Sequence, residues 1–416
     1  MIIDSSVYNG ACSCGREHKM ETKMAIVEKG CFKELKSYLK TYGLVGHCTA
    51  VYDENTYRTT DHMHPAVELE IILNPENLHA NEKGVELLMN CLPPKTEVLI
   101  AVGSGTIHDI TRYCAYQRGI PFVSCPTAAS VDGFCSSVAA MTWNGAKKTL
   151  TAVAPTFVLA DIDIIKNAPI YLARSGFGDM IGKYIALADW KIAHILTGEF
   201  YCDRIADMMA QATKAVLDSA EGVLKGEDAA YEELTYGLLL SGLAMQMMGN
   251  SRPASGAEHH ISHMIEMKPE GLGVHSEALH GEKVGVGTIL ASAEYHRLMS
   301  LSEEQWGDYP EITDEEIGCI FGERLSGEIR KENEKDCASG ITGERIREYL
   351  EDIRREVAKI PTAKSLTEAY QCIGAKKELA DIDVDGGLEA GLVNCSPLVR
   401  NRLTLMRLRR CLKGDV

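Results

Sequence analysis

Short apolar runs and stretches of helical spacing alternate along the first part of the chain. Five apolar, partly β-branched runs predict strands at His47–Tyr52, Glu70–Leu73, Glu97–Val102, Pro121–Cys125 and Thr156–Asp161. Periodic stretches around them predict helices at Cys31–Thr41, Glu82–Asn90 and Ile107–Gln117. Strands that alternate with helices indicate a parallel, Rossmann-like sheet with helices on its faces. Late in this region, Asn144-Gly145 has the form of a hairpin turn.

The pattern changes after Pro169, where apolar residues recur at helical spacing with little clustering of β-branched residues. This spacing predicts helices at Asp179–Leu196, Ile205–Leu224 and Ala230–Met248. The last of them is apolar nearly all round, which indicates a helix buried in the middle of a second domain. We therefore expect an α/β domain over residues 1–168, beginning with an irregular arm at 1–20, and an all-helical domain over residues 169–416.

Two further segments of the helical half stand out by their charge. Residues 303–336 carry 12 acidic and 4 basic side chains, which fits a solvated helical insertion better than a partner surface. Residues 400–413 are basic and amphipathic, and they predict a closing helix. Its packed side consists of Leu403, Leu405, Met406 and Leu412.

Length and charge narrow the classes of function. A chain of 416 residues is long enough for two or three domains with a substantial core. The net charge of −16 disfavours nucleic acid, whose phosphates need a basic surface, although a small anionic substrate can still bind in a locally basic pocket. No apolar stretch approaches the length of a membrane span, and the N-terminus lacks an apolar signal core. We expect a cytoplasmic protein that forms a homo-oligomer, most simply a dimer.

The chain contains 14 cysteines, and their scattered positions do not follow a disulfide framework. This distribution favours a reducing compartment. Cys12 and Cys14, followed by His18, could bind a soft metal. Two thiols and one imidazole lack a fourth ligand, however, so a surface arm with reduced thiols is the simpler interpretation.

A glycine-rich loop, Gly103-Ser104-Gly105-Thr106, lies between a predicted strand and a predicted helix. Glycines let a pyrophosphate approach the backbone, and the start of the helix offers N–H groups and the positive end of its dipole. The loop therefore predicts a dinucleotide site, although Asp109 stands where the common G-x-G-x-x-G pattern has its third glycine. Asp53 ends an earlier strand and is either a ribose ligand or a strand-end turn residue. If it binds the ribose it disfavours a 2′-phosphate, an effect that Arg58 could offset, so NADH and NADPH both remain possible.

The segment Cys125–Gly133 follows the next predicted strand and is rich in small residues, so it can approach a ligand closely. Asp132 in this segment could accept hydrogen bonds from substrate hydroxyls. From these residues alone, a turn aspartate before a glycine is the simpler interpretation.

Asp179, His259 and His280 form a possible metal-ligand set in the helical half. One carboxylate and two imidazoles suit a divalent metal and leave coordination positions free for a substrate oxygen, which the metal would polarise as a Lewis acid. Asp179 is expected to open the first long helix, and His280 to follow His259 across a loop. From spacing alone, ordinary core or surface histidines are an equally open interpretation.

Three more side chains are candidates near this set. His263 shares a helix face with His259, whereas Glu258 and His260 are expected to point to other faces. His263 is therefore a candidate proton relay or phosphate contact.

Lys183, shortly after Asp179, could bind a substrate anion or the nicotinamide side of the cofactor. Arg252 could pair with a phosphate, because a guanidinium suits a bidentate oxyanion. An exposed cation at a helix end is the equally open alternative for both.

Taken together, these residues resemble the superfamily of iron-containing alcohol dehydrogenases, glycerol dehydrogenase and dehydroquinate synthase, and most of all its sn-glycerol-1-phosphate dehydrogenases. The resemblance covers about residues 46 to 290 and is most specific from Ser251 to His263. The segments that carry it are Val102-Gly103-Ser104-Gly105-Thr106-Ile107-His108-Asp109, Pro126-Thr127-Ala128-Ala129-Ser130-Val131-Asp132-Gly133, Gly176-Phe177-Gly178-Asp179, Ser251-Arg252-Pro253-Ala254-Ser255-Gly256-Ala257-Glu258-His259 and His280-Gly281-Glu282-Lys283.

The resemblance implies a two-domain, dehydroquinate synthase-like fold with the site in the cleft between the domains. It implies reduction of dihydroxyacetone phosphate to sn-glycerol 1-phosphate by NADH or NADPH, and a divalent metal, zinc or nickel, held by Asp179, His259 and His280. Asp132, His263 and Lys183 would be catalytic, and Asp132, Arg252 and His263 would contact the substrate. The implied cofactor site consists of Gly103, Ser104, Gly105, Thr106, Asp109, Thr127, Ser130 and Ser136. Asp53 joins these residues as a candidate from its position at the end of a strand.

Three alternatives remain open beside this function. A dehydroquinate synthase-like cyclase is disfavoured because that family has glutamate as its first metal ligand, where this chain has Asp179. A dehydrogenase of free polyols, such as glycerol, is the closest rival, and Arg252 weakly favours a phosphorylated substrate over it. A non-catalytic sensor of dinucleotide and metal could lose a ligand freely, yet all three ligand positions are filled.

Overall fold

The computed structural model describes residues 1–60, 67–143 and 146–414. They form two compact units. Unit 1 consists of Met1–Met180 and Lys214–Asn250, and unit 2 consists of Ile181–Thr213 and Ser251–Val416. The helical segment Lys214–Asn250 thus belongs with the sheet, a different division from the one expected at residue 168. The assignment of cofactor binding to 1–168 and of metal and substrate binding to 169–416 stays a prediction.

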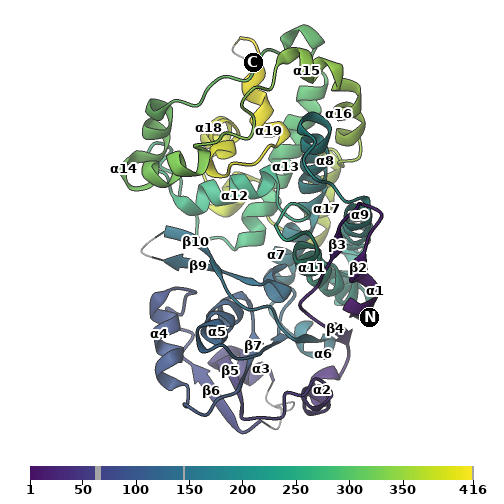
Figure 1. Ribbon diagram of the computed structural model, residues 1–416, viewed down its shortest axis with the longest axis vertical. Helices are drawn as coiled ribbons and strands as arrows, with labels where there is room; N and C mark the ends of the chain where they lie inside the picture. The colour runs from purple at the N-terminus through teal and green to yellow at the C-terminus, as the bar shows by residue number, and fades with distance from the viewer. Residues whose placement is uncertain (61–66, 144–145, 415–416) are drawn as a thin grey trace. The chain divides into compact units, whose positions relative to one another are not determined.

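Unit 1 is built on a seven-stranded sheet with the strand order β1-β4-β11-β8-β7-β5-β6 (Figure 1). All neighbouring strands pair in parallel except the edge strand β1, which is antiparallel to β4. The predicted parallel sheet is therefore confirmed, and all five predicted strands are present with ends shifted by one residue. The seven strands are β1 (Ile2–Asp4), β4 (Met24–Glu28), β5 (Cys48–Asp53), β6 (Leu69–Leu73), β7 (Val98–Gly103), β8 (Phe122–Pro126) and β11 (Phe157–Asp161).

The prediction of an irregular arm over residues 1–20 is wrong. The arm contains β1, helix α1 (Ser5–Tyr8) and a small antiparallel pair, β2 (Gly10–Ala11) and β3 (Glu17–His18). Strand β4 was also missed, because its apolar run is short and lies between charged residues. Its Ala25, Ile26 and Val27 are nevertheless fully buried between β1 and β11.

Alternation along β7 divides the core of unit 1 into two layers. Leu99 and Ala101 face one layer, whereas Val98, Ile100 and Val102 face the other. Helices α4 (Glu82–Cys91) and α5 (Gly105–Arg118) cover the first layer, and the turn η1 (Cys31–Glu34) with helix α2 (Leu35–Thr41) covers the second (Figure 1). The helices predicted from periodicity are thus confirmed on both faces of the sheet.

The remaining elements of unit 1 surround this sandwich. Strands β9 (Val138–Trp143) and β10 (Ala146–Thr151) form an antiparallel pair, and the hairpin turn predicted at Asn144-Gly145 lies outside the described residues. The other helices are α3 (Glu54–Thr59), α6 (Ile162–Ile165), α7 (Ile170–Ile181), α10 (Ala220–Lys225) and α11 (Asp228–Met248), while α9 (Asp203–Asp218) crosses the division between the units.

Helix α11 is buried on all sides around its centre, as the sequence predicts, but it packs in unit 1. Every residue from 237 to 244 is buried. At Gly242 an added Cβ would lie 2.9 Å from both Asp132 O and Cys135 Cβ. The absence of a side chain there allows α11 to approach the segment after β8, which explains its grouping with the sheet.

Unit 2 is entirely helical, as predicted for the C-terminal half. Helix α12 packs along α13, and together with α8 they contribute to a large apolar core. Its helices are α8 (Lys183–Thr197), α12 (Ala257–Met267), α13 (His280–Met299), α14 (Asp314–Asn333), α15 (Gly343–Glu348), α16 (Leu350–Val357), α17 (Ala363–Ile373), α18 (Glu389–Cys395) and α19 (Leu405–Leu408).

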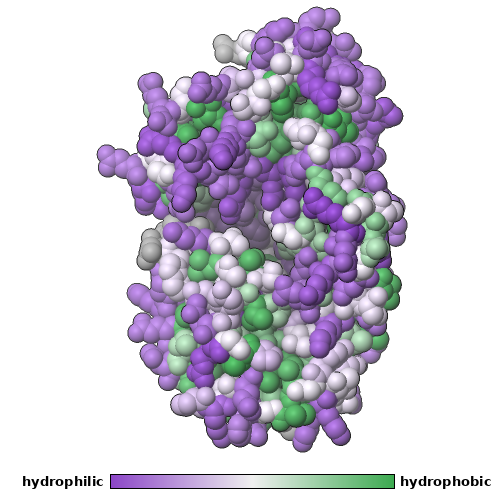
Figure 2. All heavy atoms as spheres, viewed as in Figure 1, coloured by the Kyte–Doolittle hydropathy of each residue, from purple (hydrophilic) through white to green (hydrophobic). Residues whose placement is uncertain are grey.

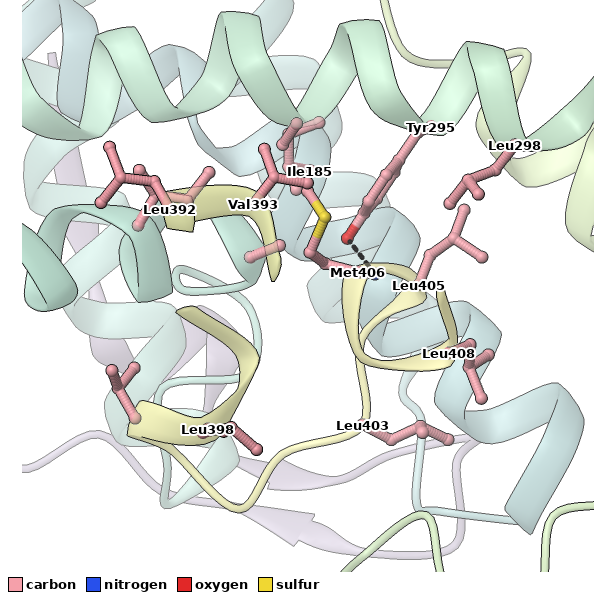
Figure 3. Close-up of a cluster of buried hydrophobic side chains, with 14 of the residues drawn as sticks. Ile185, Tyr295, Leu298, Leu392, Val393, Leu398, Leu403, Leu405, Met406 and Leu408 are labelled. Carbon is pink, nitrogen blue, oxygen red and sulfur yellow. Dashed lines mark hydrogen bonds between the residues drawn. The ribbon is translucent and has the colours of Figure 1, made fainter. Parts of the chain in front are cut away.

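The C-terminal segment fills this core, but the single closing helix predicted over 400–413 is wrong. Only α19 and a 3-10 turn at Arg409–Cys411 are helical. The predicted packing is confirmed, because Leu403, Leu405 and Met406 are buried in the same cluster as Tyr295 and Leu298 of α13 (Figure 3), and Leu412 is partly buried against it. The backbone N–H of Met406 donates to the hydroxyl oxygen of Tyr295 at 3.2 Å.

The acidic segment 303–336 forms an amphipathic helix, in agreement with the solvated interpretation. Helix α14 buries Ile317, Phe321, Leu325 and Ile329, while most of its other residues are exposed. Hydrophilic residues dominate the face of this unit seen in Figure 2. Among the described residues, the helices fall short of the length and apolar character that a membrane crossing requires.

Candidate active site

The glycine loop of unit 1 forms the predicted strand-to-helix turn. Gly103 ends β7, Ser104 is the N-cap of α5, and Gly105 and Thr106 are its first residues. No side chain caps this helix, and no acidic residue lies in its first turn. Its N-terminal N–H groups can therefore bind an anion such as a pyrophosphate.

The position of this loop in the sheet also suits a dinucleotide. Strand β5 pairs with β6 on one side and with β7 on the other, so the chain changes direction across the sheet between β5 and β7. In open parallel sheets, ligands bind beyond the carboxyl ends of strands at such a switch point. Asp53 ends β5 and Gly103 ends β7, which places both at this edge.

Asp53 also has a structural role, in agreement with the interpretation of it as a strand-end turn residue. Its Oδ1 accepts a hydrogen bond from the backbone N–H of Thr56 at 2.8 Å, and the Thr56 hydroxyl lies 3.0 Å from the Asp53 N–H. The pair forms a capping box at the start of α3. A contact between Asp53 and a ribose stays a prediction.

Two buried residues of α5, His108 and Arg112, hold the backbone around this edge of the sheet. His108 lies between the carbonyl oxygen of Ser104 (3.0 Å from Nδ1) and the hydroxyl of Ser124 (2.8 Å from Nε2). Burial, and to a lesser degree the charge of Arg112, lowers the pKa of His108 to about 3, so the ring is neutral. Arg112 donates to carbonyl oxygens between residues 134 and 138, and Asp109 lies close enough to act on its charge. Asp109 is thus tied to this structural arginine, and its predicted cofactor contact stays a prediction.

The segment after β8 continues the same edge of the sheet. Thr127 and Ser130 are buried, and the Ser130 hydroxyl lies 3.0 Å from that of Ser104. The Thr127 N–H donates to Gly103 O at 3.0 Å. The Ser136 side chain makes a local contact, because its hydroxyl donates to the carbonyl oxygen of Val138, two residues further on. The structure therefore joins Thr127 and Ser130 to the glycine loop, and Ser136 makes a local turn contact.

Asp132 lies between two elements of unit 1. Its carboxylate Oδ2 accepts a hydrogen bond from the Ser241 hydroxyl at 2.8 Å, and its backbone N–H donates to Oδ2 of Asp179 at 3.0 Å. Its side chain does not cap the following turn. A simple turn aspartate therefore does not describe Asp132, which connects α11 with the buried carboxylate of α7.

Asp179 is fully buried in the last turn of α7, so the prediction that it opens a helix is wrong. Two glycines, Gly176 and Gly178, lie inside this helix, although glycine weakens helices. Gly176 has a packing reason, since an added Cβ would lie 2.1 Å from Ala129 O. Ser175 also donates to Ser130 O at 3.2 Å. Helix α7 therefore lies directly against the segment after β8 and presents its carboxylate to the Asp132 N–H.

Unit 2 brings the two predicted ligand histidines together. His259 lies in the first turn of α12 and His280 is the first residue of α13, with the predicted loop between the helices. Their ring centroids are 5.4 Å apart, and one ligand nitrogen of each lies within 4.8 Å of the other. His263 joins them on the same face of α12, with its ring centroid 6.1 Å from that of His259 and 6.0 Å from that of His280.

Each of the two histidines is oriented by a glutamate that sequence reasoning missed. His259 Nδ1 lies 2.6 Å from Glu258 Oε1, and His280 Nδ1 lies 3.0 Å from Glu266 Oε1. A carboxylate on Nδ1 fixes that nitrogen as the donor and leaves the lone pair of Nε2 for a metal. The prediction that Glu258 points away from the site is wrong, because Glu258 is fully buried against His259.

The charge of Glu266 is held in place by its neighbours. Burial alone would raise the pKa of this carboxyl, but its interaction with His280, including their hydrogen bond, and the positive charge of Lys283 outweigh burial and hold it well below the usual range. Lys283 Nζ lies 3.2 Å from the same oxygen that contacts His280. Glu266 is therefore ionised at neutral pH, which makes it a strong acceptor for the His280 ring.

A buried aspartate sets the start of α12. Asp189 accepts hydrogen bonds from the Tyr295 hydroxyl (2.7 Å), the Leu405 N–H (2.8 Å) and the Ala257 N–H (2.9 Å). Burial raises the pKa of Asp189 to about 7 in spite of these donors. Because Ala257 is the first residue of α12, Asp189 fixes the helix turn that carries His259.

The positions of Arg252 and Lys183 contradict one of the two interpretations of the sequence, that of exposed cations. Neither is an exposed helix-end cation, since both are buried. The guanidinium of Arg252 forms a bidentate pair with Glu199, with Nε 2.6 Å from Oε1, and its Nη1 donates to Leu403 O at 2.8 Å. A contact between Arg252 and a substrate phosphate stays a prediction. Lys183 is the first residue of α8 and keeps its predicted role as a candidate.

The orientation of His280 by Glu266 leads to a first prediction. Glu266→Gln removes the negative charge but keeps the size of the side chain, so it should weaken metal affinity by about 10–100-fold, the usual effect of losing such a partner. Metal titration by isothermal calorimetry would measure this. Glu277→Gln, an exposed acid of the same unit, is the matched control and should bind as the unaltered chain does. Equal affinity in both variants would show that Glu266 does not orient the ligand.

The comparisons with known proteins fit these features. A family model described as iron-containing alcohol dehydrogenase matches residues 26–169. A glycerol-1-phosphate dehydrogenase [NAD(P)+] from Bacillus licheniformis is 40% identical over 410 residues, covering 96% of this chain and 92% of the relative. One from Halalkalibacterium halodurans is 32% identical and covers 95% and 94%.

A solved structure of similar fold is the iron-containing alcohol dehydrogenase from Corynebacterium glutamicum. It has a TM-score of 0.62 and 15% sequence identity, and the match covers 96% of this chain and 97% of that one. At this identity the likeness concerns the fold, and it agrees with the predicted combination of a parallel sheet and a helical half.

Proposed function

Because this chain belongs to the glycerol-1-phosphate dehydrogenase family, we propose that it reduces dihydroxyacetone phosphate to sn-glycerol 1-phosphate, reversibly, with NADH or NADPH. It is an NAD(P)-dependent oxidoreductase that uses a metal ion. The main observation behind the proposed metal site is that glutamates contact Nδ1 of both His259 and His280. This arrangement leaves the Nε2 lone pair of each ring available to a metal.

We propose that Asp179, His259 and His280 each give one ligand atom to a divalent metal, zinc or nickel. The donor types fit such an ion, because one carboxylate and two imidazoles suit either metal. When bound there, the metal supplies Lewis-acid polarisation of the substrate oxygen, and the reduced nicotinamide supplies the hydride.

The chain itself positions the cofactor and the substrate. We propose that Gly103, Ser104, Gly105 and Thr106 bind the pyrophosphate through the uncapped start of α5. Thr127 and Ser130 lie next to this loop, through the Ser104–Ser130 contact, and would line the same site. Asp109 and Ser136 remain candidate cofactor contacts from the family resemblance, and Asp53 remains one from its position at the end of β5.

The proton added to the substrate oxygen needs a donor path in this chain. His263 suits it, because burial holds its pKa well below the usual range and a neutral imidazole has one donor and one acceptor nitrogen. We propose that His263 relays this proton and that Asp132 binds a substrate hydroxyl through its carboxylate. The Lys183 ammonium would hold the substrate anion, and Arg252, which also pairs with Glu199, remains a candidate contact for its phosphate.

The decisive experiment compares two ketones as substrates of purified, metal-loaded enzyme. Loss of NADH absorbance should be fast with dihydroxyacetone phosphate and slow with dihydroxyacetone, and a chiral assay should identify the product as sn-glycerol 1-phosphate. Preference for the unphosphorylated ketone would instead assign the chain to the polyol dehydrogenases. Turnover of neither ketone would reject the proposal and return the cyclase and sensor alternatives.

We also propose a cytoplasmic enzyme that forms a dimer. The 14 cysteines support a reducing compartment, because their scattered positions do not follow a disulfide framework. Light scattering on the purified enzyme would give the mass of the assembly, and a monomeric mass would reject the dimer.

A further inference from the structure

The N-terminal arm of unit 1 folds into a hairpin that gathers two thiols and one imidazole. Between β2 and β3, the Cys12 N–H donates to Arg16 O at 2.9 Å and the Gly15 N–H donates to Cys12 O at 3.0 Å. Gly15 has a φ of 83°, a conformation that glycine favours, and it lets the chain reverse here. As a result, Sγ of Cys12, Sγ of Cys14 and a ring nitrogen of His18 lie within 4.8 Å of one another.

The ring of His18 is oriented as a metal ligand. Its Nδ1 lies 2.9 Å from the carbonyl oxygen of Met247, the penultimate residue of α11. Its Nε2 lies 3.2 Å from Cys14 Sγ. A carbonyl only accepts, so Nδ1 carries the hydrogen and the lone pair is on Nε2, which faces the thiol. Metal-bound histidines commonly donate their other N–H to a backbone carbonyl in this way.

The chain just after this arm is also held against α11, by Gln246. Gln246 Oε1 accepts hydrogen bonds from the N–H groups of Glu21 (2.8 Å) and Thr22 (3.1 Å), and its Nε2 donates to the Thr22 hydroxyl. His18 itself is only 2% exposed. The chain around the three side chains is therefore ordered by contacts that do not involve them, which reduces the entropy lost when they bind an ion.

We propose that Cys12, Cys14 and His18 bind a structural zinc ion, with the buried thiol of Cys202, directly before α9, as its fourth ligand. Structural zinc is four-coordinate, and three thiolates with one imidazole is one of its usual ligand sets. The fourth ligand would thus be a cysteine that lies 184 residues after His18, too far along the chain for local spacing to reveal it. The zinc would fasten the arm, and its chemistry is distinct from that of Asp179, His259 and His280, a set without sulfur.

The zinc site of the arm can be tested separately from the proposed function, because Asp179, His259 and His280 would give a metal no sulfur ligand. The His259→Ala variant, grown and purified with zinc, should retain about one zinc per chain, measured by mass spectrometry of the metal. X-ray absorption should place three sulfur atoms at about 2.3 Å and one nitrogen at about 2.0–2.1 Å from this zinc. A zinc without sulfur neighbours, or a Cys12–Cys14 disulfide in place of the metal, would overturn the site, and only two sulfur neighbours would overturn the assignment of Cys202.

Substitution of the thiols gives a second, independent test. Cys12→Ser with Cys14→Ser should lose about one zinc per chain and should unfold at a lower temperature than the unaltered protein. The matched control is Cys319→Ser with Cys372→Ser, which removes two exposed thiols and should keep all its zinc. If the double variant of the arm keeps its full zinc content, the proposal is wrong. If it does not fold, the absorption spectrum of the His259→Ala variant still decides.

Discussion

His259→Ala is expected to remove the metal and the dehydrogenase activity together. The variant loses one of two imidazoles whose ring positions are fixed by glutamates, so the remaining ligands should hold the ion far more weakly. Lewis-acid stabilisation by a metal amounts to several kcal/mol, and a loss of about 5 kcal/mol lowers kcat/KM by roughly 10³–10⁴-fold. The measurement is kcat/KM for dihydroxyacetone phosphate beside the nickel and zinc content of the same sample.

The control for this prediction is His275→Ala, which removes an exposed histidine of the same unit. It should keep both its metal and its activity. Full activity in a metal-free His259→Ala protein would refute the metal-dependent mechanism. If the proposed zinc of the arm exists, it should remain in His259→Ala, so added nickel is the better label for the site of Asp179, His259 and His280.

The layered architecture follows from hydrophobic patterning, which is why it could be predicted. A central strand such as β7 is a continuous apolar run, because it is buried on both faces. Strand β4 has the same environment with only four apolar residues in a row, Met24 to Val27, between charged neighbours. Its burial depends on pairing with β1 and β11, which lie far apart in sequence, and no local pattern reports that pairing.

The candidate site could be predicted only in part, for a similar reason. His259 and His280 stood out because imidazoles beside glycines and helix ends are unusual. Glu258 and Glu266 could not be recognised, since glutamate on a helix ordinarily faces solvent and only the tertiary structure turns these two inward. The burial of Arg252 could not be predicted either, because its partner Glu199 is 53 residues away and no spacing reveals that the cation is already paired.

Gly176→Ala should destabilise unit 1 and impair catalysis at the same time. The added methyl group would lie 2.1 Å from Ala129 O, 2.8 Å from Ala129 C and 3.0 Å from Leu238 Cδ1. Two of these atoms are backbone, so relief requires α7 to move away from the segment after β8. Overpacking of this kind lowers the free energy of unfolding by about 1–3 kcal/mol, and a contact with rigid backbone belongs at the upper end. Urea unfolding followed by tryptophan fluorescence would measure it.

Gly327→Ala provides the matched control for this prediction. Gly327 lies in α14, is exposed, and has no atom within 4 Å of an added Cβ. Alanine there should stabilise the helix by up to about 1 kcal/mol. The two glycines thus predict opposite signs for the same chemical change, which separates packing from helix propensity.

The effect of Gly176→Ala on activity follows from what α7 carries. Asp179 lies one helical turn further on, and its Oδ2 accepts the N–H of Asp132, in the segment that the new methyl group would displace. A shift of α7 would therefore misplace a proposed metal ligand and a proposed substrate contact together, so kcat/KM should fall at temperatures where the variant is still folded. A folded Gly176→Ala protein with unchanged kcat/KM and metal content would show that the contact between α7 and Ala129 does not position Asp179.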